Sequence, residues 1–325
     1  MRSRSLIGLA ALAGSAAAAI GIGRAFRHDM RDVSAALAGG SELVATEFGA
    51  VEYGREGIGP TVLVSHGAGG GYDQGLFVGR ELLGSAWDVI APSRFGYLRS
   101  ESPGRPLPDV QADAYAALLD RLGVERAVVL GISAGAPSAI EMALRHPERV
   151  AALILVVPRA YAPGCEVTAE HSPPNEMIMR MIERGADFAF WLAIRLARRT
   201  VLRFLGVPAA VDRAADPLER ARLTWIMQSI LPLSRRVEGI RNDGAAVIGA
   251  WPLERIGAPT FVVSAEDDLF GTLPAARFTA AHIAGAELMV LPSGGHLLAG
   301  RTDEIRARIS AFLRRALATP GRAAA

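Results

Sequence analysis

The stretch that decides the fold is AVVLGISAGAPSAIEMALR, residues 127–145. Its first four residues are all apolar, which is typical of a strand buried on both faces. Gly131-Ile132-Ser133-Ala134-Gly135 follows, and the next residues have helical spacing with Pro137 in the first turn, where proline is tolerated. A serine between a strand and a helix takes a strained backbone conformation, and small neighbours remove the clashes. The pattern predicts an exposed Ser133 hydroxyl at a helix N-terminus, which favours negative charge. The alternative is a purely structural glycine turn.

The same kind of apolar run recurs on both sides of this stretch. Helical spacing lies between the runs, over Asp109–Leu122, Ala134–Arg145 and Asp303–Leu317. Strands that alternate with helices predict a mostly parallel sheet covered on both faces. The predicted strands are Thr61–Ser65, Trp87–Ala91, Ala127–Ile132, Ala151–Val157, Thr260–Ser264 and Glu287–Leu291, with a hairpin of Leu43–Phe48 and Ala50–Tyr53 around Gly49.

One long segment interrupts this alternation. Between Pro158 and Pro259 the sequence has helical character and no convincing strand, and residues 176–205 are strongly apolar. We interpret residues 159–258 as a helical cap inserted into a core made of residues 41–158 and 259–317. The apolar cap residues predict a pocket for a lipophilic substrate, with packing inside the cap as the alternative. These residues are Met177, Met181, Phe188, Phe190 and Trp191.

The first residues form a separate element. Leu6–Gly23 carries no charge and is bracketed by Arg2 and Arg4 on one side and Arg24 and Arg27 on the other. Such a run is typical of a membrane anchor or a secretory signal peptide. We therefore predict that residues 1–27 associate with a membrane, through residues 6–23, or direct export. Without either role, the chain is expected in the cytoplasm.

Composition excludes several kinds of chemistry. All 35 basic residues are arginine, and the net charge is +2. Without lysine the chain has no Schiff-base nucleophile, no anchor for pyridoxal phosphate and no phosphate-loop lysine. No basic tail is present, so nucleic acid is not an expected partner. The single cysteine, Cys165, and the scattered histidines give no zinc-ligand spacing, and no metal or cofactor is expected.

Candidate partners for Ser133 lie after other predicted strands. A hydroxyl is a weak nucleophile that needs a base, and His296 follows the last strand in Gly294-Gly295-His296. The imidazole needs a carboxylate to hold its tautomer. Glu266-Asp267-Asp268 follows Thr260–Ser264, and its three adjacent acids leave that choice open.

Acyl transfer also requires hydrogen-bond donors for an oxyanion. The glycine-rich segment His66–Gly71 follows Thr61–Ser65, and its glycines free backbone N–H groups to point inward. With the N–H of Ala134, which follows Ser133, it would supply two donors. A dinucleotide-binding loop is the competing interpretation, but the glycine spacing does not match that motif.

In these segments the sequence resembles the α/β-hydrolase family, whose elbow motif has this form. The matching stretches are VLVSHGAGGG (62–71), the segment around Ser133, APTFVVSAEDDLF (258–270) and SGGH (293–296), in the order serine, acid, histidine. The resemblance implies an eight-stranded, mostly parallel sheet flanked by helices, with an inserted cap.

The resemblance also implies a role for each matched residue. Ser133 would be the nucleophile, His296 the base and Asp268 the acid, with Asp267 as the fallback. The oxyanion donors would be the N–H groups of Ala134 and of Ala68, with Gly69 as an alternative to Ala68. Arg94 and Arg99 would order a neighbouring loop without a catalytic role.

The implied function is that of a serine hydrolase acting on a small carboxylic ester or related acyl substrate through an acyl-enzyme. The same triad supports C–C bond hydrolysis, lactone opening, cofactor-free peroxidation or acyl transfer, which are the alternatives. A non-catalytic ligand-binding protein is an alternative of another class. A serine nucleophile in place of aspartate disfavours dehalogenase and epoxide hydrolase chemistry.

Overall fold

The computed structural model describes residues 2–165 and 173–318 and divides the chain into two units, Met1–Gly39 and Gly40–Ala325. The first unit is a single helix, α1 (Arg2–Gly39). Across the described residues, no helix combines the length and hydropathy needed to span a membrane. The anchor predicted in residues 1–27 gains no support from this finding.

The second unit contains an eight-stranded sheet in the order β1-β2-β4-β3-β5-β6-β7-β8. The edge strands β1 and β2 form an antiparallel hairpin, β2 is antiparallel to β4, and all other neighbours are parallel. The predicted eight-stranded, mostly parallel sheet is thus confirmed. The strands are β1 (Glu42–Thr46), β2 (Gly49–Glu56), β3 (Thr61–Ser65), β4 (Asp88–Pro92), β5 (Ala127–Ile132), β6 (Val150–Val156), β7 (Thr260–Ala265) and β8 (Glu287–Leu291).

Helices cover the sheet on both sides because the central strands are apolar on both faces. Along β5, Val129 packs into the core on one face, whereas Val128 and Leu130 pack into the core on the other. The sequence predicted three of the covering helices, but not α2 or α11. One face carries α3 (Pro108–Arg121), α4 (Ala136–Arg145) and α11 (Leu273–His282), and the other carries α2 (Tyr72–Leu83) and α12 (Thr302–Ala318).

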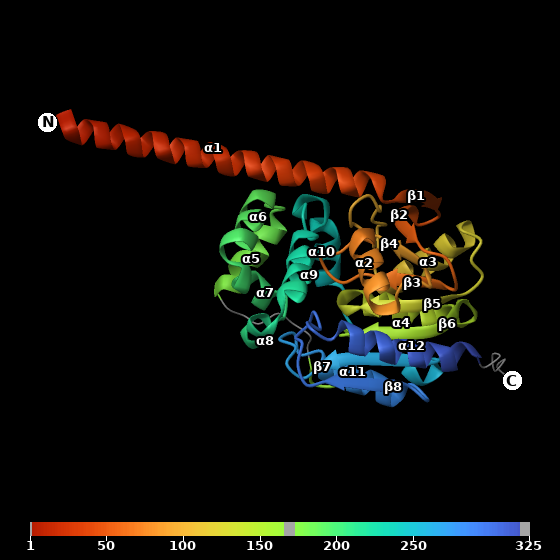
Figure 1. Ribbon diagram of the computed structural model, residues 1–325. Coiled ribbons are helices and arrows are strands. Elements are labelled where there is room, and N and C mark those ends of the chain that lie inside the picture. Colours follow the sequence, from red (N-terminus) through yellow and green to blue (C-terminus); the bar gives the residue numbers. More distant parts are fainter. Residues whose placement is uncertain (1, 166–172, 319–325) are drawn as a thin grey trace. The chain divides into compact units, whose positions relative to one another are not determined.

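In its described part, the chain between β6 and β7 forms helices and adds no strand to the sheet, as predicted (Figure 1). The apolar stretch 176–205 is not one helix, because it is broken at Gly185, with φ of +58°, and at Ala197. Residues 166–172 of this segment lie outside the described residues. The helices are α5 (Pro173–Glu183), α6 (Asp187–Leu196), α7 (Arg198–Phe204), α8 (Ala209–Ala214), α9 (Pro217–Gln228) and α10 (Val237–Ala245).

Candidate active site

Ser133 lies on the tight turn between β5 and α4, where its backbone φ is +49°. Few residues other than glycine adopt this left-handed conformation. The glycines beside it are required by close approach of neighbouring segments. A Cβ on Gly135 would lie 2.2 Å from the carbonyl oxygen of Ser65, and one on Gly131 would lie 2.6 Å from the Cβ of Ala139. These glycines let β3, β5 and α4 meet closely enough to hold Ser133 on the turn.

Two hydrogen bonds join Ser133, His296 and Asp268. Oγ of Ser133 lies 2.8 Å from Nε2 of His296, and Nδ1 of His296 lies 2.8 Å from Oδ2 of Asp268. Asp268 also accepts hydrogen bonds from the Thr272 hydroxyl and from the N–H of Phe270. Burial raises the pKa of Asp268, but His296 and these two donors outweigh it and lower the pKa below its ordinary value. An ionised Asp268 keeps the imidazole proton on Nδ1, which leaves Nε2 to accept the proton of Ser133.

Asp267, the fallback acid, has a different position. Its carboxylate accepts hydrogen bonds from the N–H of Gly295 at 2.8 Å and from the N–H of Gly294 at 3.3 Å. It therefore supports the backbone of the loop that carries His296. The structure brings Asp268, and not Asp267, against the imidazole.

The predicted oxyanion donors lie beside this group of side chains. Ala68 and Ala134 line the same cavity as Ser133 and His296. Among the described residues, none accepts a hydrogen bond from the N–H of Ala68. The N–H of Gly69, by contrast, donates to the hydroxyl of Tyr97 at 3.2 Å. Of the two alternatives, Ala68 is therefore the residue with a donor available to a ligand.

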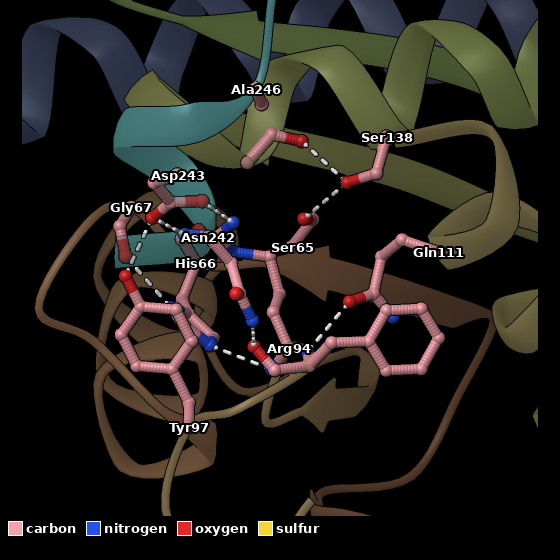
Figure 2. A network of polar contacts seen from close by, with 12 residues as sticks. Ser65, His66, Gly67, Arg94, Tyr97, Gln111, Ser138, Asn242, Asp243 and Ala246 are labelled. Carbon is pink, nitrogen blue, oxygen red and sulfur yellow. Dashed lines mark hydrogen bonds and ion pairs between the residues drawn. The ribbon is translucent and has the colours of Figure 1, made fainter. Parts of the chain in front are cut away.

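A buried polar network holds the loop that contains Ala68 (Figure 2). Nε2 of His66 accepts the backbone N–H of Arg94 at 2.9 Å, so the imidazole proton is on Nδ1 and is donated to the carbonyl of Gly67 at 2.8 Å. Burial and the Arg94 guanidinium lower the pKa of His66 well below its ordinary value, and the ring is neutral. Nε of Arg94 donates to the carbonyl of His66 at 2.8 Å. Arg94 thus contacts the loop, whereas Arg99 binds Glu52.

Helix α10 and the residue before it complete this network. The Asp243 carboxylate accepts hydrogen bonds from both terminal nitrogens of Arg94 and from the hydroxyl of Tyr97, the last at 2.5 Å. Arg236 is fully buried, donates to the carbonyl of Gly70 at 2.6 Å and pairs with Asp73 at 2.9 Å. Tyr97, Arg236 and Asp243 were not predicted from the sequence. No local pattern marks them, because the paired residues lie 146 and 163 positions apart in the chain.

Ser133 and His296 face a cavity of about 810 Å³. Its volume and mostly apolar wall suit a small organic molecule. In the described part of the chain, no cluster of three or more His, Cys, Asp or Glu side chains is arranged to hold a metal ion. The apolar wall includes Val157, Phe190, Phe204, Ile226, Ile230 and Phe270.

The two interpretations of the apolar cap residues apply to different residues, since one of the five lines the cavity and the other four do not. Of the five apolar residues named from the sequence, only Phe190 reaches it. Met177 and Phe188 are exposed, and Trp191 is buried elsewhere. The breaks at Gly185 and Ala197 turn the helices relative to one another, so one helical periodicity does not describe the whole stretch.

Comparisons with known proteins point to one fold family. A family model described as the alpha/beta hydrolase fold matches residues 60–205. An alpha/beta hydrolase fold protein from Nakamurella multipartita is 31% identical with a TM-score of 0.63, over 84% of this chain and 99% of that one. An uncharacterized hydrolase of Bacillus subtilis is 27% identical, over 79% of this chain and 92% of its own length. The 2-hydroxymuconate semialdehyde hydrolase of a Pseudomonas strain is 29% identical, over 74% and 81% respectively.

Proposed function

The chain belongs to the alpha/beta-hydrolase fold family, and we propose that it is a serine hydrolase that cleaves a small ester or related acyl compound. The observation that carries the proposal is the hydrogen-bonded series of Asp268, His296 and Ser133 at the wall of an apolar cavity. A hydroxyl bonded to an oriented imidazole is an activated nucleophile.

The proposed reaction has two steps. Oγ of Ser133 attacks the carbonyl carbon while Nε2 of His296 takes its proton, and Asp268 stabilises the resulting imidazolium. The N–H groups of Ala68 and Ala134 hold the oxyanion. His296 then protonates the leaving alcohol, and an acyl group remains on Ser133. Water attacks the acyl carbon of this acyl-enzyme while His296 takes a proton from it. As the bond to Oγ of Ser133 breaks, His296 returns the proton to Oγ, and the carboxylic acid leaves. These steps use only groups of this chain and water.

We assign residues 159–258 the role of a cap that shapes the cavity. Phe190, Phe204, Ile226 and Ile230 all come from this segment, and they support a preference for a lipophilic substrate. Burying an apolar chain against such a wall contributes about 0.8 kcal/mol for each methylene group.

The test is labelling of the full chain with a fluorophosphonate probe beside a Ser133→Ala variant. The expected result is a single adduct that peptide mass analysis places on Ser133 and that the variant lacks. A panel of esters, thioesters and lactones then defines the acyl substrate. Folded protein that shows neither labelling nor turnover would favour a non-catalytic ligand-binding role.

Hydrolysis of a C–C bond is the second candidate. It is supported by the likeness to a relative that is named as a 2-hydroxymuconate semialdehyde hydrolase. The two candidates differ in the bond that is cut. Turnover of a semialdehyde of this type, without turnover of simple esters of the same size, would favour C–C hydrolysis.

A further inference from the structure

Three arginines form hydrogen bonds at helix α10 or just before it, and among the described residues two of them pair with a carboxylate. Arg94 pairs with Asp243, and Arg236 pairs with Asp73. The third is Arg159. Among the described residues its guanidinium makes two hydrogen bonds, to the backbone carbonyls of Asp243 at 2.6 Å and of Ala246 at 3.0 Å.

The carboxylate near Arg159 is already occupied. Both oxygens of Asp243 accept hydrogen bonds from Arg94, and one also accepts the hydroxyl of Tyr97. Arg94, Arg159 and Asp243 together carry one uncompensated positive charge. Three of the five N–H groups of the Arg159 guanidinium make no hydrogen bond to a described residue.

Arg159 lies beside the nucleophile. It follows β6, and its backbone N–H donates to the carbonyl of Ser133 at 3.0 Å. Its half-buried side chain lines the cavity that Ser133 and His296 face. Burial lowers the pKa of Arg159, as does Arg94, and Asp243 opposes this in part. A cation that is partly removed from water without a counter-ion is stabilised when an anion binds it.

The other charged residues of the cavity wall are accounted for differently. Arg222 is paired with Glu81 and Glu219. Glu176, Arg180 and Glu183 also line the cavity, but they lie on α5 and are exposed to solvent. Among the described residues of the cavity wall, Arg159 is therefore the partly buried cation that an anionic ligand would stabilise.

We infer that Arg159 is an anion-binding subsite of the cavity and that the substrate carries a carboxylate on an apolar chain. A planar guanidinium with free N–H groups matches a carboxylate, which it binds through paired hydrogen bonds. The inference rests on the proposed function for the position of the bond that is cut. Half-esters of dicarboxylic acids combine the three required parts, namely an ester at Ser133, an apolar spacer and a terminal carboxylate.

The test measures binding without turnover, in the full chain carrying Ser133→Ala. The ligands are monomethyl esters of dicarboxylic acids from succinate to suberate, each compared with the neutral dimethyl ester of the same acid by calorimetry. At the best chain length we expect the monoanion to bind about 10- to 100-fold more tightly, the range of a charge-assisted hydrogen bond. Arg159→Gln should abolish this ratio, and Arg159→Lys should retain part of it.

Arg180→Gln is the matched control, because it removes the same charge from the exposed rim of the same cavity. It should change the ratio by less than about threefold, as expected for a solvent-screened charge. Absence of a preference for the monoanion at every length overturns the subsite, and this result needs no Arg159 variant. A preference that survives Arg159→Gln also overturns it.

Hydrolysis of the same half-esters by the wild-type chain separates the two proposals. Arg159-dependent binding without hydrolysis or fluorophosphonate labelling leaves the subsite standing and refutes the serine hydrolase. Labelling and hydrolysis without a preference for the monoanion support the serine hydrolase and refute the subsite.

Discussion

Replacing Asp243 with asparagine should destabilise the sheet unit by about 3 kcal/mol. The side chains of Arg94 and Asp243 are only 7% and 13% exposed, so the variant leaves a buried guanidinium without its counter-ion. Breaking such a pair by removing one partner costs about 3–5 kcal/mol. The lower end applies because asparagine keeps one acceptor oxygen and Arg94 keeps its bond to the carbonyl of His66.

The expected change in melting temperature follows from the size of the unit Gly40–Ala325. At about 2.1 cal/mol/K per residue its entropy of unfolding is about 0.6 kcal/mol/K, so 3 kcal/mol corresponds to about 5 °C. Differential scanning calorimetry of the full chain measures this shift directly.

Glu56→Gln is the matched control, since it makes the same chemical change in an exposed pair. The side chains of Arg80 and Glu56 are 57% and 51% exposed, and such pairs contribute about 0–1 kcal/mol. The control should lower the melting temperature by less than about 2 °C. A shift for Asp243→Asn no larger than that of the control would show that water reaches the pair of Arg94 and Asp243, and would refute the expected cost of burying Arg94 unpaired.

Three further predictions concern single residues. Asp268→Asn should lower kcat about 10⁴-fold by releasing the imidazole tautomer, whereas Asp267→Asn, which only weakens backbone hydrogen bonds, should lower it by about tenfold or less in the same ester assay. Gly135→Ala should cost at least about 2 kcal/mol in thermal unfolding, because its Cβ would meet a backbone oxygen, and Gly104→Ala, with open space around it, should be near neutral. The hydrogen bond from Arg145 lowers the pKa of the Asp113 carboxyl. This interaction stabilises the fold at pH values above the ordinary pKa of an aspartate. The stabilisation is lost as pH falls through the lowered pKa, so the difference in melting temperature between wild type and Asp113→Asn should shrink below pH of about 4.

Local sequence predicted the sheet and the position of Ser133 because both depend on neighbouring residues. A strand buried on both faces needs an uninterrupted apolar run, as in β5 and β6. The turn at Ser133 needs glycine at positions 131 and 135, since a Cβ at either would overlap another segment. His296 and the acids beside Asp268 follow strands whose carboxyl ends meet at one edge of the sheet.

Helix α2 escaped prediction because two glycines interrupt its apolar pattern. Glycine has low helix propensity, so the sequence YDQGLFVGRELL, residues 72–83, does not predict a helix. In the structure these glycines let α2 lie close to the sheet. A Cβ on Gly75 would lie 2.7 Å from the Cβ of Ala91, and one on Gly79 would lie 2.7 Å from a methyl group of Val89. The lost propensity is compensated by tertiary packing, which a local pattern does not contain.

The choice between Asp267 and Asp268 was also beyond local reasoning. Both carboxylates follow β7 and both form hydrogen bonds to the loop of His296. They differ only in which group of that loop each one meets. This depends on the turn at Phe270, whose N–H bonds to Asp268 and fixes the direction of its side chain.

The buried arginines explain why the cap segment and the sheet form one unit. Arg236 lies just before α10, and its partners are Asp73 and the carbonyl of Gly70, which belong to the core. Arg94 belongs to the core, and its carboxylate partner is on α10. Separating the two segments would break both buried ion pairs and leave each segment with an unpaired charge. An unpaired ion that stays buried costs several kcal/mol. We therefore expect the proposed cap, residues 159–258, to unfold together with the sheet, because these two buried pairs link them.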